Sequence, residues 1–147
     1  MSHTRNTIIT AITALLATAP VSWTRVFNQR IVSERVLDTY LMVYFENESS
    51  ERLTIHDSSP YRCTVQFRVD ATFRIADYED LEAAIGTVAA EIQTKLTNSA
   101  LRAITNKAQD LSIVQTSASI EEEQTTFALM AQTWTFTYMM NEGSPTT

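Results

Sequence analysis

Glycine, proline and cysteine are scarce in this chain, and each shortage excludes a class of protein. Two glycines and three prolines in 147 residues argue against repeats, collagen-like segments and flexible linkers. The two glycines, Gly86 and Gly143, cannot supply a glycine-rich phosphate loop. The single cysteine excludes an internal disulfide, and one cysteine with two distant histidines cannot supply spaced metal ligands. We therefore expect no cofactor and no metal site.

Sequence signals of catalysis are also missing. The chain has no GxSxG motif. His56 and Asp57 are its only histidine–aspartate neighbours, and we interpret them as part of a polar turn. Cys63 lies at an apolar position of a predicted strand, so we interpret it as a small buried hydrophobic residue. We expect no catalytic residues and no enzymatic activity. The alternative is a soluble α+β ligand-binding or small enzyme domain, which would place convergent polar groups in an apolar pocket.

Positive charge and long apolar runs are limited as well. The net charge of −6 argues against non-specific binding to nucleic acid. Nine of the eleven basic residues are arginines, which favour paired, structured contacts. The segment Ile8–Ala17 superficially resembles a signal peptide, but Pro20 follows the would-be cleavage site and the segment is apolar on one helical face only. No other run reaches about 18 strongly apolar residues, so we expect no membrane span.

Strict alternation from Tyr61 to Arg74 is the clearest pattern that is present. Successive side chains of a strand point to opposite faces, so this segment is predicted to be one strand with an apolar and a solvated face. Its fourteen residues far exceed the usual strand of about 5–6. Such a strand spans on the order of 45 Å, and we expect part of it to project or to line an assembly surface. The apolar positions are Tyr61, Cys63, Val65, Phe67, Val69, Ala71 and Phe73.

The remaining patterns predict two amphipathic helices and several further strands. Helices are expected where apolar residues recur every three or four positions, and strands where β-branched and aromatic residues alternate. The predicted helices are Ser2 or Thr4 to Thr18, Asp77 (as the N-cap) to about Leu96, and one further turn within Ser99–Lys107. The predicted strands are Ser22–Asn28, Val36–Glu46, Tyr61–Arg74, Asp110–Thr116 and Thr125–Met140, with an exposed loop over Asn47–Pro60 that has room for a short strand at Leu53–His56.

This order of elements predicts an α+β fold. Adjacent strands with short connections are antiparallel by default, and two helices with an apolar stripe must cover a sheet that has one apolar face. We therefore expect a two-layer sandwich, with a mostly antiparallel sheet and two main helices packed on one face. The length predicts a single domain over residues 1–147, with residues 1–3 and 141–147 frayed.

Charged residues outside the predicted core are the candidate interface residues. The arginines on the solvated face of the long strand could meet acidic residues of an adjacent subunit. Glu121–Glu123 could bind a cation or a neighbour's arginine, or could simply be solvated. The loops Asn28–Arg35 and Asn47–Pro60 are further candidates, because loops that project from a rigid sheet commonly carry binding. The candidate residues are Arg25, Arg30, Arg35, Arg62, Arg68, Arg74, Glu121, Glu122 and Glu123.

Several segments in this order resemble a known family. They are the helix RNTIITAITALL, the strand Arg25–Phe27, a strand pair with a long polar loop, the strand RxxVxFRV, the acidic-capped helix DYEDLEAAI and the terminal hairpin ending TWTFTYM. Together they resemble the tail terminator proteins of long-tailed bacteriophages, the gpU-like minor tail proteins. The resemblance covers roughly residues 4–140 and includes no invariant motif, so no individual binding residue carries over.

The resemblance implies a structural virion protein. Such proteins form a ring, typically a hexamer, at the head-proximal end of the tail tube, where they stop polymerisation of the tube protein and meet the neck or connector protein. Genomic DNA would touch this ring only in passing through its lumen. The protein would be assembled in the host cytoplasm and located in the virion tail. A neck or head-completion protein of the same virion and a component of a bacterial tail-like injection system are the alternatives.

Overall fold

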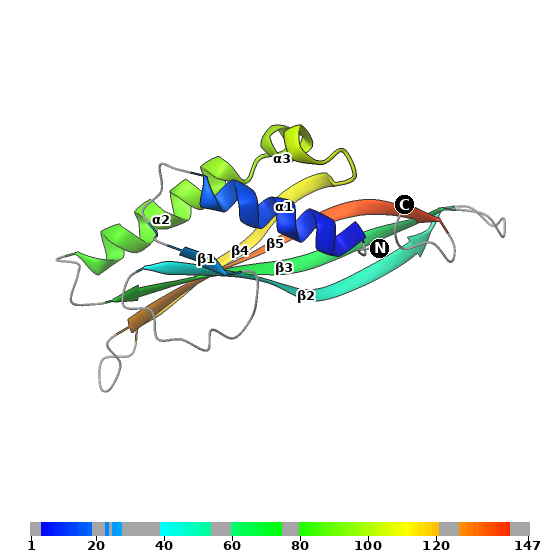
Figure 1. Cartoon of the computed structure of the whole chain (residues 1–147). Coiled ribbons are helices and arrows are strands. Elements are labelled where there is room, and N and C mark those ends of the chain that lie inside the picture. Colours follow the sequence, from blue (N-terminus) through cyan, green and yellow to red (C-terminus); the bar gives the residue numbers. More distant parts are fainter. Residues whose placement is uncertain are drawn as a thin grey trace.

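The computed structural model describes residues 4–18, 23, 25–27, 39–53, 60–74, 80–120 and 127–141. These residues form an α+β fold in which the sheet dominates (Figure 1). The elements in chain order are α1 (Thr4–Ala17), β1 (Arg25–Phe27), β2 (Tyr40–Arg52), β3 (Pro60–Arg74), α2 (Leu81–Lys95), α3 (Asn98–Ile104), β4 (Gln109–Ile120) and β5 (Phe127–Asn141). Among the described helices, none combines the length and the apolar character needed to cross a membrane.

The five strands form one mixed sheet in the order β1-β2-β3-β5-β4. β2, β3, β5 and β4 pair antiparallel, as expected, whereas β1 runs parallel to β2 with Arg25 opposite Tyr40. The default expectation of antiparallel pairing is therefore wrong for β1 and β2. Residues 28–39 connect these two strands, and a connection of about a dozen residues is long enough for the crossover that parallel pairing requires.

β3 and β5 form the centre of the sheet. Each has fifteen residues, and they pair without a shift from Pro60 opposite Asn141 to Arg74 opposite Phe127. This confirms the long strand that the alternation predicted. At one end of the sheet β2, β3 and β5 run on past the N-terminal end of α1 (Figure 1). The long strands therefore extend beyond the helices that cover them.

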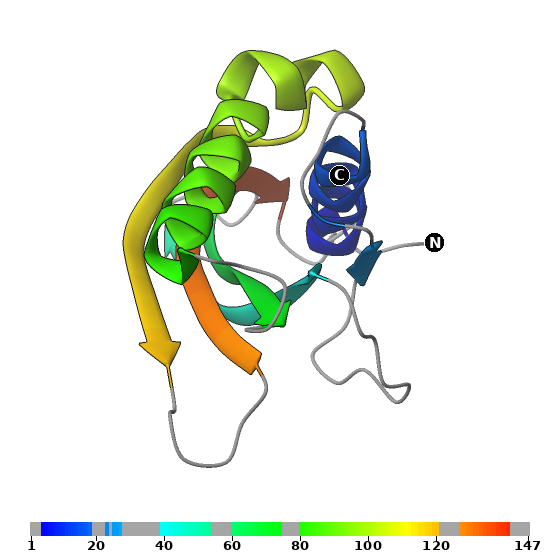
Figure 2. The same ribbon diagram turned by 90° about the vertical axis from the view of Figure 1, so that its left-hand side faces the viewer.

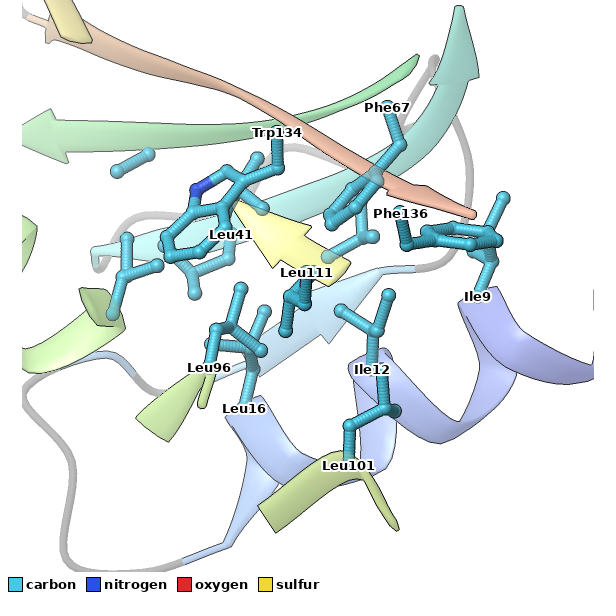
Figure 3. Close-up of a cluster of buried hydrophobic side chains, with 14 of the residues drawn as sticks. Ile9, Ile12, Leu16, Leu41, Phe67, Leu96, Leu101, Leu111, Trp134 and Phe136 are labelled. Atoms are coloured by element: carbon cyan, nitrogen blue, oxygen red, sulfur yellow. The ribbon is translucent and has the colours of Figure 1, made fainter. Parts of the chain in front are cut away.

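The helices lie together on one side of the sheet (Figure 2). The predicted apolar stripes are confirmed, because Ile8, Ile12 and Leu16 of α1 and Val88 and Ile92 of α2 are buried. On the strands, alternate side chains meet them in one cluster (Figure 3). The fully buried strand residues of this cluster include Leu41, Val43, Cys63, Val65, Phe67, Val69, Ala71, Phe73, Met130 and Phe136.

The second helix begins later than predicted. Its N-cap is Asp80, whose backbone is extended and whose Oδ1 accepts a hydrogen bond from the N–H of Ala83 at 3.1 Å. The predicted cap, Asp77, lies outside the described residues and three positions too early. Two aspartates, Asp77 and Asp80, precede the apolar stripe, and either could cap a helix. The observed cap is the one directly before Leu81.

β2 is longer than its hydrophobic pattern indicated. Asn47–Arg52 was predicted to be loop, yet it pairs with β3 from Gln66 to Tyr61 after a register shift between Phe45 and Asn47. These polar residues are strand because the long β3 offers their backbone groups hydrogen-bond partners. The short strand predicted at Leu53–His56 is not observed at Leu53, and its other residues lie outside the described part of the chain.

Candidate assembly surface

The side of the sheet without helices is a candidate assembly surface, which we call the open face. Its side chains alternate with core residues, so Gln66, Arg68 and Asp70 point away from the side to which the buried Phe67 and Val69 belong. Most of its members are polar. They include Met42, Tyr44, Glu46, Asn47, Ser49, Glu51, Arg62, Thr64, Gln66, Arg68, Asp70, Ala131, Thr133, Thr135, Thr137 and the exposed apolar Leu129.

Three residues of β2 and β3 form a polar cluster near the middle of the open face. The hydroxyl of Tyr44 donates to Asp70 Oδ2 at 2.7 Å. Arg68 Nη2 lies 3.2 Å from Asp70 Oδ1, and the guanidinium carbon lies 5.8 Å from the centre of the Tyr44 ring. Cross-strand contacts of this kind stabilise a strand pair. Arg68 therefore has an acidic partner within its own chain.

A second polar contact lies at the register shift of β2. Gln66 Nε2 donates to Glu46 Oε2 at 2.8 Å. No sequence pattern indicated a role for Glu46 or Tyr44. Their partners lie 20 and 26 positions away in the chain, and only the register of β2 on β3 brings them together.

The predicted interface residues are distributed over the sheet. Arg62 is exposed and lies opposite Glu51, near one end of β3, and Arg74 is the last residue at the other end of the same strand. Arg25 begins β1. The side chains of Arg25 and Arg74 are not among those described. Arg30, Arg35, Glu121, Glu122, Glu123, His56 and Asp57 lie outside the described residues altogether.

A partly buried polar cluster lies on the helix side, at the end of the sheet where α1 begins. The hydroxyl of Tyr138 donates to Glu48 Oε1 at 2.8 Å, and Arg5 Nη1 lies 3.9 Å from the same oxygen. The Arg5 guanidinium also stacks 4.1 Å from the centre of the Phe45 ring. Burial, and then the bond to Glu48 and its charge, raise the pKa of Tyr138 above its usual range. Tyr138 therefore acts as a neutral hydrogen-bond donor.

Cys63 lies beside this cluster and is fully buried, as predicted. Its sulfur lies 3.5 Å from the hydroxyl oxygen of Ser50. Within the described residues, no three His, Cys, Asp or Glu side chains come together in a way that could hold a metal ion.

Two cavities are formed by described residues at the surface. One, of about 370 Å³, lies between α1 and β2 and is lined by Asn6, Ile9, Thr10, Tyr44 and Phe45. The other, of about 520 Å³, lies along α2 and is lined by Thr87, Ala90, Glu91, Thr94 and Lys95. The ligand-binding alternative requires polar groups that converge in an apolar pocket. The second cavity instead carries its polar groups along one exposed side of a single helix.

The edge of the sheet at β4 is a second candidate surface, because its side chains are exposed. All described side chains from Ser112 to Ala118 are exposed, including the branched apolar residues Ile113 and Val114. At the start of the strand, Asn98 Oδ1 accepts from the Leu111 N–H at 2.8 Å, and Asn98 Nδ2 donates to the Leu111 carbonyl at 3.2 Å. α3 thus closes the first part of this margin, and the rest of β4 lies beyond it.

Comparison with known proteins does not assign this chain to a family. A scan against protein-family models finds no match, and a search of curated proteins finds no similar sequence. Functional inference therefore depends on the residues and on the fold.

Proposed function

We propose that this chain is the subunit of a ring that caps the head-proximal end of a bacteriophage tail tube. In this role it ends tube polymerisation and provides the joint to the neck, without catalysis. The proposal combines the order of elements, which resembles that of tail terminator proteins, with the form of the sheet. Its mechanism is steric: one side of the ring binds the last ring of the tube, and the other side offers no surface on which the tube can grow.

The observation that carries the proposal is the contrast between the two faces of the long β3–β5 sheet. A subunit that surrounds a channel needs one surface for the lumen and another for the exterior. We propose that helices and sheet pack as a two-layer sandwich with the helices outward. The open face would then line the lumen, with side chains that are mostly uncharged.

The charges on the open face are compatible with DNA in transit. Arg62 and Arg68 are accompanied by Glu46 and Asp70 on the same face. Strong binding to DNA requires several basic groups that neutralise phosphates. A nearly balanced polar surface would instead let DNA slide through. We therefore expect weak DNA binding that disappears at physiological salt.

Negative-stain imaging of the purified chain at micromolar concentration, in parallel with a tube-growth assay, tests the proposal. We expect six-fold rings with an open centre, either free or on tube ends, and growing tubes whose length stops increasing when the chain is added. A neck protein would instead bind the connector and leave tube growth unchanged. Monomers that neither form rings nor arrest tube growth would contradict the proposal.

A further inference from the structure

β4 has the properties of a strand that accepts a further strand. It has twelve residues, and no charged residue or proline occurs from Leu111 to Ile120. Proteins usually protect a free edge with charges, proline, a β-bulge or a very short strand. From Leu111 onward β4 has only the register irregularity between Ile113 and Gln115 as protection, and there Val114, with 59% of its surface exposed, presents an apolar side chain at the margin. The backbone chemistry of such an edge fits another β-strand.

The opposite side of the sheet offers a second free strand segment. β1 pairs with β2 only along Tyr40–Met42. Further along β2, the segment Glu46–Glu51 lies beside β3 on its inner side and is paired with it from Asn47 onward, and no described strand lies on its outer side. Figure 2 shows that β1 and β4 form opposite margins of the sheet. The two free segments therefore face away from each other in one copy.

The two segments differ in charge. The β2 segment contains Glu46, Glu48 and Glu51, of which Glu48 lies on the helix side beside Arg5. β4 itself has no basic residue, but the exposed Arg102 and Lys107 precede it. Arg52 and Asp110 offset part of each charge without reversing its sign. Two β2 segments brought together would place acidic side chains side by side, and like charges across a strand pair are destabilising. The charges thus favour a contact between different edges.

We infer that β4 of one copy adds to the β2 segment Glu46–Glu51 of the next copy as an antiparallel strand. This inference rests on the proposed ring and names the contact that closes it. Each neighbouring pair from β2 through β3 and β5 to β4 is antiparallel, so β2 and β4 run in opposite directions. A copy rotated about an axis along the strands brings these two edges together antiparallel. Because the contact joins different surfaces, repeated rotation can close it into a ring.

Cross-linking between engineered cysteines tests this contact. Gln115→Cys and Ser49→Cys place exposed thiols on β4 and on the β2 segment, and the native Cys63 is fully buried and serves as the unreactive background. A short bismaleimide is used, because closed sheets are staggered and the spacer tolerates a shift along the strands. In the double variant, we expect a ladder of covalent oligomers that ends at the hexamer. Each single variant should remain monomeric on a denaturing gel.

The same gel separates the alternatives. Covalent dimers of Gln115→Cys alone would mean that β4 pairs with β4, and they would overturn the inference. If the double variant forms rings but gives no cross-linked ladder, the β4–β2 contact is also wrong. The proposed capping function would still stand. A ladder from a protein that does not arrest tube growth would support strand addition and contradict the capping function.

A matched pair of substitutions provides a second test. Val114→Lys puts a charge on the free edge, whereas Val114→Thr keeps a β-branched side chain of similar size. We expect Val114→Lys to reduce ring formation at least tenfold at a given protein concentration and Val114→Thr to leave it within twofold. Unchanged circular dichroism and thermal unfolding would show that both variants fold. Rings of Val114→Lys at the parental level would contradict the inference.

Discussion

Gln132 illustrates how single polar residues hold this fold together. It is fully buried on the helix side of β5. Its Nε2 donates to the Ala89 carbonyl of α2 at 3.2 Å, and its Oε1 accepts from the Trp134 indole at 2.9 Å. A buried polar group without such partners costs free energy. Gln132 therefore connects sheet and helix through bonds that a hydrophobic residue of the same size could not make.

Replacing Gln132 with leucine should lower the free energy of unfolding by about 1–3 kcal/mol, because the Trp134 indole N–H is left buried without an acceptor. Urea unfolding measures the change. Trp134→Phe removes this donor, so the cost of Gln132→Leu should be smaller when phenylalanine is already present at position 134. The same cost in both backgrounds would contradict the role assigned to the indole bond.

Tyr138 should make stability sensitive to alkaline pH. Its pKa in the folded chain is raised by burial and by Glu48, whereas an unfolded tyrosine ionises near pH 10. Below that pH both states hold the proton and the stabilising effect is complete. As pH rises above about 10, the unfolded chain loses the proton first, so stability falls. Tyr138→Phe should flatten this fall, and denaturant unfolding at a series of alkaline pH values would detect it. An equally steep fall in the variant would refute the assignment.

At the scale of elements, α3 and β4 are joined by one side chain. Asn98 contacts both the N–H and the carbonyl of Leu111, and so replaces a neighbouring strand for that residue. Asp110, directly before Leu111, has a positive φ of 50°, a conformation in which asparagine and aspartate are enriched. The conformation at the start of β4 therefore depends on local hydrogen bonding as well as on the burial of Leu111.

Asn98→Ala should destabilise the chain by about 1–3 kcal/mol, because two backbone groups of Leu111 lose their partner. Hydrogen exchange should detect the loss of these bonds directly. The Leu111 amide should exchange faster, and the core amides of β3 should change little. Ser99→Ala, an exposed neighbour on α3, is the matched control and should leave that amide unchanged. Unaltered protection of Leu111 in Asn98→Ala would rule the contact out as a structural element.

At the scale of the whole molecule, the sheet has a helix side and an open side. The arginines of the open side differ in how closely an acidic residue of the same chain engages them. Arg68 is engaged with Asp70 in its own chain. Arg62 is exposed and has Glu51 as its cross-strand neighbour. Of these two arginines, Arg62 therefore has more freedom to meet a neighbouring subunit.

The row of arginines on β3 is the alternative to the β4–β2 edge as the ring contact. If this row joins the subunits, the variant Arg62→Ser/Arg68→Ser/Arg74→Ser should abolish ring formation and leave a folded monomer. Analytical ultracentrifugation gives the oligomeric state, and circular dichroism confirms folding. Lys95→Ser, which removes a basic residue from α2 on the helix side, is the control and should still assemble. Rings of the triple variant at the parental level would exclude the arginine row from the contact.

Much of the fold could be predicted because the buried residues of a helix or strand recur at regular intervals in the sequence. The alternation around Val65 and Phe67 predicted the long central strand, and the spacing of Ile8, Ile12 and Leu16 predicted the first helix. The polar end of β2 has no such apolar pattern. Asn47–Arg52 forms a strand because its backbone pairs with β3, and it has no apolar face of its own. The candidate surface was predicted only in part, because Arg62 and Arg68 follow the alternation whereas their neighbours depend on strand register.

The amino-acid sequence by itself determined the apolar faces of α1, α2 and the long central strand β3, because hydrophobic periodicity is local to each element. Only the tertiary structure decided that β1 runs parallel to β2, that Tyr44 bonds to Asp70 and Tyr138 to Glu48, and that β4 lies at the margin of the sheet. These are relations between segments that are distant in the chain. They depend on strand order and register, which no single segment encodes.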